Sequence, residues 1–206
     1  TPLATVTVKS GVAFDYEHRT HDGRTFKLVL TPRWLPIEPT PTTSLNGTMK
    51  DNDLAQLSAQ AFDQTPGRYW RELADVRRFR EAALLIERYL ELHAELSRAD
   101  AVNLHFHAGQ CWAFCSGGDA KEEHARLVKA IKHLELSKVD TLEVADGSLL
   151  WRAYVDGTMG FLMGKRDMLL ASRDEVAKGD EANKANLAVL DRLIANLDKQ
   201  YVEAYE

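Results

Sequence analysis

Residues 101–124 read AVNLHFHAGQCWAFCSGGDAKEEH, and this stretch lies between two segments with helical periodicity. It contains both cysteines and three of the seven histidines of the chain. A turn at Ala108-Gly109-Gln110 makes it a β-hairpin, in which successive side chains alternate between two faces. One face then holds Leu104, Phe106, Trp112 and Phe114, and the other holds Asn103, His105, His107, Cys111 and Cys115. The sequence therefore predicts an apolar core face and one strip of thiols and imidazoles.

The first hypothesis for this strip is a thiol nucleophile. In the predicted hairpin His107 lies directly across from Cys111, with about 5 Å between their β-carbons. An imidazole at that distance withdraws the thiol proton and favours the reactive thiolate. Cys111 and His107 are therefore the candidate catalytic pair, for hydrolysis of an amide, ester or isopeptide bond, for acyl transfer, or for deamidation.

The second hypothesis is a zinc site with His105, His107 and Cys111 as ligands, because imidazole and thiolate are the ligands that zinc prefers. His124 or Cys115 is the candidate fourth ligand. His124 shares a helix face with apolar residues and should point away from the strip, so three protein ligands are expected rather than four. No other cofactor is predicted.

The third hypothesis is structural. Cysteine is often a small core residue, and histidine is commonly found half-buried in a strand, so the strip needs no chemistry to explain it.

Long helices are predicted on both sides of residues 101–124. Apolar residues recur at steps of three and four over residues 68–98, in two adjacent seams that would bury the helix against two neighbours. A second helix is predicted over residues 119–136, with Asp119 as its N-cap. A third begins at Asp180 after a break at Gly179, and its narrow seam makes it the expected partner of the helix at 68–98.

A hairpin is predicted near the N-terminus from strands at residues 12–19 and 25–31. A three-residue His21-Asp22-Gly23 loop pairs Phe14 with Leu30 and keeps the apolar faces of the two strands together. A further strand is predicted at residues 3–8, and a proline-rich connection follows the hairpin.

A three-stranded meander is predicted over residues 141–145, 148–155 and 158–163, because Asp146-Gly147 and Asp156-Gly157 are typical hairpin turns. The first turn pairs Val144 with Leu149 and Leu142 with Trp151. Both faces of this meander are largely apolar, so it requires cover on both sides, from helices or from a second chain.

These elements predict an α+β fold, with antiparallel hairpin and meander sheets packed against two long helices. We expect one domain over residues 1–206, a length sufficient to bury a substantial core. Its layers are N-terminal strands and a proline-rich connection at 1–45, a helical part at 46–100, the hairpin, helix and meander at 101–165, and a C-terminal helix at 166–206.

The composition narrows the range of partners. A net charge of −5 disfavours nucleic acid and anionic membranes, which are bound mainly by clustered basic residues. The arginines between residues 68 and 80 alternate with acidic residues and are expected to form a solvated helix face. No apolar stretch is long enough to span a membrane, no signal peptide is recognisable, and two cysteines do not make a disulfide framework, so a cytoplasmic protein is expected.

The leading functional hypothesis is a protein-binding or assembly protein that acts through its helical seams and the apolar meander, either with another protein or by homo-oligomerisation. Met159, Met163 and Met168 are the candidate partner surface, because flexible thioether side chains adapt to different partners. The alternatives are the cysteine-dependent hydrolase or deamidase and the zinc-binding protein described above. Gly160–Lys165 falls one residue short of a phosphate-binding loop, so nucleotide binding is not expected.

Overall fold

The computed structural model describes residues 14–19, 25–30, 49–144 and 147–206. The internal contacts of the chain divide it into two compact units, residues 1–47 and residues 48–206. Each unit is described by itself.

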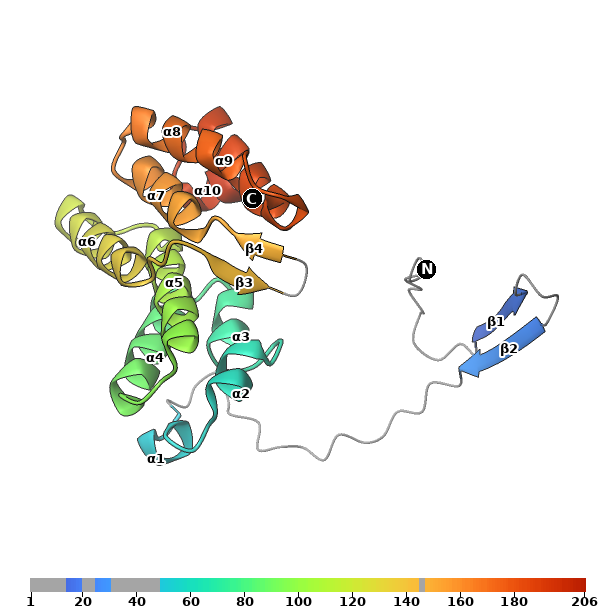
Figure 1. The fold of residues 1–206 in the computed structure, drawn as a ribbon. Helices are drawn as coiled ribbons and strands as arrows, with labels where there is room; N and C mark the ends of the chain where they lie inside the picture. Colours follow the sequence, from blue (N-terminus) through green and yellow to red (C-terminus); the bar gives the residue numbers. More distant parts are fainter. Residues whose placement is uncertain (1–13, 20–24, 31–48, 145–146) are drawn as a thin grey trace. The chain divides into compact units, whose positions relative to one another are not determined.

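The described part of the first unit is an antiparallel hairpin of β1 (Phe14–Arg19) and β2 (Thr25–Leu30) (Figure 1). Phe14 pairs with Leu30, which confirms the register predicted from the apolar faces. The predicted strand at residues 3–8 and the proline-rich connection lie outside the described residues.

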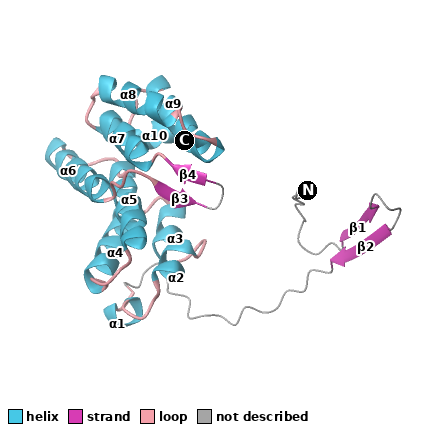
Figure 2. Ribbon diagram, in the orientation of Figure 1, coloured by secondary structure: helices cyan, strands magenta, loops and turns pink. Residues whose placement is uncertain are grey.

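The second unit is mostly helical, as Figures 1 and 2 show. Its helices are α1 (Asp51–Leu54), α2 (Ala59–Gln64), α3 (Tyr69–Asp75), α4 (Phe79–Leu92), α5 (Arg98–Phe114), α6 (Ala120–Leu136), α7 (Trp151–Leu162), α8 (Arg166–Val176), the 3-10 helix η1 (Glu181–Asn183), α9 (Lys184–Ala195) and α10 (Tyr201–Tyr205). Between α6 and α7 a short hairpin pairs β3 (Leu142–Val144) with β4 (Gly147–Leu149). The predicted α+β class is therefore wrong, because most of the predicted strands after residue 100 are helices.

Helix α5 occupies the centre of the second unit, between two hydrophobic clusters. It contributes Leu104 and Trp112 to the cluster built mainly from α1–α5. It contributes Val102 and Phe106 to the cluster built mainly from α5–α10. The most extensive helix contacts are α5 with α6, α7 with α8, and α4 with α5, so neighbours in the chain are largely neighbours in space.

The predicted hairpin at residues 101–115 is wrong, because this stretch lies almost entirely within α5. Ser97 caps the helix by accepting a hydrogen bond from the Asp100 backbone N–H at 3.1 Å. A helix buried on several sides carries apolar residues all round and shows no stripe at a period of 3.6. The alternation of apolar and polar residues between positions 102 and 107 is therefore typical of a strand, although the segment is helical.

The predicted meander is also wrong. Trp151 begins α7, and only the short β3–β4 hairpin forms, with Leu142 opposite Leu149 rather than Trp151. A β-carbon on Gly157 would lie 2.8 Å from the Leu190 side chain, and one on Gly160 would lie 2.8 Å from the Leu169 backbone nitrogen. These glycines therefore permit close helix packing and do not form turns.

The single long helix predicted over residues 68–98 is divided into α3 and α4. Arg77, between them, has a φ of 61°, which lies in the left-handed region and interrupts helical geometry. The C-terminal helix is divided as well, because α9 ends at Ala195 and Tyr201 begins α10. The predicted pairing of these two long helices is wrong, since α9 packs mainly on α7, α8 and α10.

The helix predicted over residues 119–136 is confirmed as α6. The Asp119 side chain accepts a hydrogen bond from the Glu122 backbone N–H at 2.8 Å, and the Glu122 carboxylate accepts one from the Asp119 N–H at 3.2 Å. This reciprocal capping box satisfies backbone donors that the first turn of a helix leaves free.

Helices α5 and α6, at 17 residues each, are the longest in the described part of the chain. None of the described helices combines the length and the apolar character that crossing a membrane requires.

Candidate protein-binding groove

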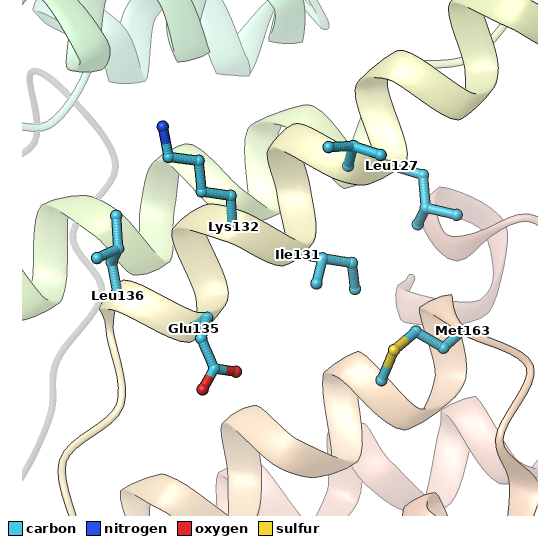
Figure 3. Close-up of a pocket in the computed structure, with 7 residues that line it drawn as sticks. Leu127, Ile131, Lys132, Glu135, Leu136 and Met163 are labelled. Atoms are coloured by element: carbon cyan, nitrogen blue, oxygen red, sulfur yellow. The ribbon is translucent and has the colours of Figure 1, made fainter.

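An apolar groove of about 480 Å³ lies between α6 and the end of α7. Figure 3 shows Ile131 of α6 and Met163, directly after α7, on its two sides. Its lining is almost entirely apolar. The residues of the groove are Leu127, Val128, Ile131, Lys132, Glu135, Leu136 and Met163.

The groove exists because α6 carries apolar residues on two faces. Ala130 and Leu134 are buried against the rest of the fold, and Leu134 lies close to Gly109 of α5. Val128 and Leu136 belong to the other face, and each is 52 % exposed. An apolar stripe that remains in solvent after the core is complete is a common mark of an interaction surface.

Two opposite charges interrupt the apolar lining. Lys132 forms no ion pair with any of the described residues. Glu135 is 60 % exposed at its side chain and lies 2.6 Å from Lys138, which also pairs with Asp156 at 2.7 Å. Among the residues that the structure describes, the groove therefore presents a cation without an ion-pair partner and, three residues further along α6, an exposed carboxylate that is already paired with Lys138.

A polar cluster fixes the opposite face of α6 to α4 and α5. Glu87 of α4 accepts a hydrogen bond from the indole N–H of Trp112 at 2.8 Å. The same carboxylate lies 3.1 Å from the Lys129 ammonium and 3.1 Å from Nε2 of His133. Lys129 also lies over the Trp112 ring, 4.1 Å from its centroid. Burial acts to raise the pKa of Glu87, but the hydrogen bonds from Trp112, Lys129 and His133 outweigh it and hold the pKa below its ordinary value.

His105 extends this cluster, with its Nδ1 3.0 Å from Nδ1 of His133. Burial lowers the pKa of His105 to about 4, and the charges of His133 and Lys132 act in the same direction. Burial also lowers the pKa of His133, although the Glu87 carboxylate opposes the shift. The cluster was not predicted, because it joins residues of three helices; the only local signal was the spacing of Lys129 and His133 on one face of α6.

The structure separates the two histidines that were predicted to share a strip. His105 faces α6, whereas the His107 ring lies 4.7 Å from the Trp70 ring and its Nε2 lies 3.6 Å from Oδ1 of Asp63. Residues two positions apart point to different sides of a helix. The predicted strip is wrong for this reason.

Cys111 and His107 lie one turn apart on α5, and no hydrogen bond between the two side chains is found among the described residues. Burial raises the pKa of Cys111 to about 12, which disfavours the thiolate that a nucleophile requires. Cys115 is half-buried and donates to the Cys111 carbonyl at 3.3 Å. The catalytic pair stays a prediction, and its environment acts against it.

The predicted zinc ligands are distributed in the same way. His105, His107 and Cys111 do not converge on one point, and no group of three suitable side chains is found in residues 49–144 and 147–206 or in the described hairpin. His124, the candidate fourth ligand, is exposed on α6. Zinc binding stays a prediction for elemental analysis to test.

Of the three methionines predicted as a partner surface, only Met163 lines the groove. Met159 is 5 % exposed and belongs to the core, and Met168 is half-buried against it.

A smaller hollow of about 320 Å³ lies beside α3, lined in part by Trp70 and Arg71. Next to it the buried Asp63 carboxylate lies 3.5 Å from the Arg71 guanidinium. Burial lowers the pKa of the neighbouring His107, and Asp63 opposes the shift. Asp63 therefore joins α2, α3 and α5 through electrostatic contacts, while its buried Oδ1 has no hydrogen-bond partner among the described residues.

No family model matches the chain, and no match is found among curated proteins or solved structures.

Proposed function

We propose that the chain is a protein-binding or assembly protein that holds its partner in the groove between α6 and the end of α7. The observation that carries the proposal is a solvent-accessible apolar lining on a helix whose other face is already buried. A partly exposed apolar patch of this kind is a common mark of a protein interface, and Lys132 and Glu135 within it add a charge pattern that a partner can match.

The apolar side chains support binding energetically. Complete burial of a valine or leucine side chain stabilises by about 1.5–3 kcal/mol. Val128 and Leu136 are about half exposed, so a partner that covers both would gain about 1 kcal/mol from each.

The helix that forms one side of the groove, α6, is held in place by two sets of contacts. The capping box orders the start of α6, and the Glu87 cluster fixes its middle to α4 and α5. A surface that is ordered before binding loses less conformational entropy when the partner arrives. A small-molecule site has less support, because such sites usually combine an apolar lining with several converging polar groups.

A reducing, cytoplasmic setting remains part of the proposal. Both cysteines are free in the structure, and neither lies in a disulfide framework that an oxidising compartment would favour.

The proposal is tested first with an apolar fluorescent dye of the anilinonaphthalene sulfonate type at submicromolar protein. Val128→Glu should weaken dye binding at least fivefold, because it places a carboxylate in the lining. Leu84→Glu is the matched control, since Leu84 is 44 % exposed on α4 and outside the groove. Equal losses in the two variants, with unchanged circular dichroism, would contradict the proposal.

A second test places a photoreactive amino acid at residue 136 or, as control, at residue 84 in cells that produce the protein. Covalent protein adducts should form from position 136 and decrease when Val128→Glu is added. Adducts that form equally from both positions would indicate contact without a specific groove.

A further inference from the structure

We infer that the partner in the groove is a second copy of this chain, which packs its own α6 across a two-fold axis. This inference rests on the proposed function of the groove and adds the identity of the occupant. The order of the side chains on the groove-lining face of α6 favours such a partner.

The four residues around the middle of the groove are arranged symmetrically along α6. They run Ile131, Lys132, Glu135 and Leu136, so the order is apolar, cation, anion, apolar (Figure 3). His133 and Leu134, between them, are turned to the core. The groove-lining face of α6 therefore has the half-buried Ile131 at one end, the exposed Leu136 at the other and two opposite charges between them.

A two-fold axis uses this arrangement directly, because the same patch must complement itself. An axis that passes midway between Lys132 and Glu135 places the ammonium of one copy against the carboxylate of the other, and it does so twice. Ile131 and Leu136 lie on either side of these charges and exclude water from them. Lys132 is available for this contact because it has no ion-pair partner among the described residues. Glu135 already pairs with Lys138 at 2.6 Å, but its side chain is 60 % exposed and remains accessible to a second cation.

The charges select orientation more than they add affinity, because an ion pair that is covered on binding loses the hydration of both charges. Helices packed in parallel with residue 132 beside residue 132 would bring the two cations together and the two carboxylates together. The order of charge therefore favours the two-fold contact with opposed helices over the parallel one.

The inference is tested by sedimentation equilibrium of the full chain between about 1 and 100 µM, with single charge reversals and their mixture. Lys132→Glu and Glu135→Lys each place like charges in contact and should raise the dissociation constant of the dimer at least tenfold. An equimolar mixture of the two variants again offers opposite charges at both contacts, so it should regain dimers. Lys199→Glu makes the same charge change at an exposed residue outside the groove and should leave the dimer intact.

Recovery of dimers in the mixture and in neither variant alone supports the inference. The inference would be overturned if the wild-type protein stayed monomeric, or if both charge reversals left the dissociation constant of the dimer unchanged. It would also be overturned if the mixture of the two variants stayed monomeric. Dye binding separates this failure from failure of the groove itself. If Val128→Glu still removes the dye site from a monomeric protein, the groove stands and its occupant is another protein.

Discussion

Helices α5 and α6 lie side by side and have the same length, but they differ in how their surfaces are buried. Helix α5 is enclosed by two hydrophobic clusters and contributes side chains to both. Helix α6 buries one face and leaves a second apolar face in solvent. Helix α5 therefore contributes to the core on both of its sides, whereas α6 contributes to the core and also leaves apolar side chains such as Val128 and Leu136 about half exposed.

The largest expected effect contrasts an α5 core residue with an α6 groove residue. Trp112→Ala should lower the free energy of unfolding by about 3–5 kcal/mol, because it empties a buried site and removes the hydrogen bond to Glu87. Leu136→Ala should change it by about 0.5 kcal/mol or less. Urea unfolding at submicromolar protein measures both, and similar losses would break the contrast between the two helices.

The contact between the helices is tested at Gly109. A β-carbon there would lie 2.8 Å from the Leu134 side chain and 3.1 Å from the Ala130 carbonyl oxygen. Gly109→Leu should therefore destabilise the fold by about 2 kcal/mol, as overpacking does. Ala125→Leu, at an exposed position of α6, is the control and should have little effect. If Gly109→Leu left the free energy of unfolding unchanged, α6 would be able to move away from α5.

Burial in α5 also predicts the reactivity of its thiol. Because burial raises the pKa of Cys111 to about 12, iodoacetamide at neutral pH should modify it at least tenfold more slowly than a free thiol peptide, a difference of about 1.4 kcal/mol in activation free energy. Cys115, which is half-buried, is the internal comparison. Mass spectrometry of the modified protein follows both sites. Fast modification of Cys111 would revive the hypothesis of an activated nucleophile.

The start of α6 should respond more weakly. Asp119→Ala removes one half of the capping box and should lower the free energy of unfolding by about 1 kcal/mol. Asp119→Asn keeps an oxygen acceptor and should restore most of the loss. If Asp119→Ala had no effect in thermal unfolding, packing alone would determine where α6 begins.

The smallest effect is a pH dependence where the two helices meet at His105. Its pKa is about 4 in the folded protein and about 6.5 in an unfolded chain. The contribution of His105 to the free energy of unfolding is therefore fully present above pH 6.5. It is lost as the pH falls toward 4, because in that range the unfolded state takes up the proton and the folded state does not. Solvent screening at this half-buried ring keeps the effect small. His105→Gln should flatten this part of a pH titration of the melting temperature, and an unchanged slope would contradict the assignment.

Local signals in the sequence allowed some elements to be predicted. Asp119 and Glu122 stand three residues apart before an apolar stripe, and the helix that follows ends where the stripe ends. The register of the first hairpin followed from keeping Phe14 opposite Leu30. In both cases the determining interactions join residues close in sequence, so the pattern and the structure carry the same information.

Other elements could not be predicted because their pattern is produced by distant contacts. Asp156-Gly157 is typical of a turn in the sequence. In the structure Gly157 lies within α7, where α9 is so close that a β-carbon would clash with the Leu190 side chain. The Glu87 cluster and the groove at Met163 join helices that no local pattern places together.

The sequence by itself determined the beginning and end of α6 and the pairing of β1 with β2, because capping joins residues three apart and register follows from the alternation within two consecutive strands. Only the tertiary structure decided that residues 101–114 are helical and that His105 and His107 point to different neighbours. The physical reason is enclosure: a helix covered on both sides needs apolar residues all round, and that pattern has no period from which a helix can be recognised.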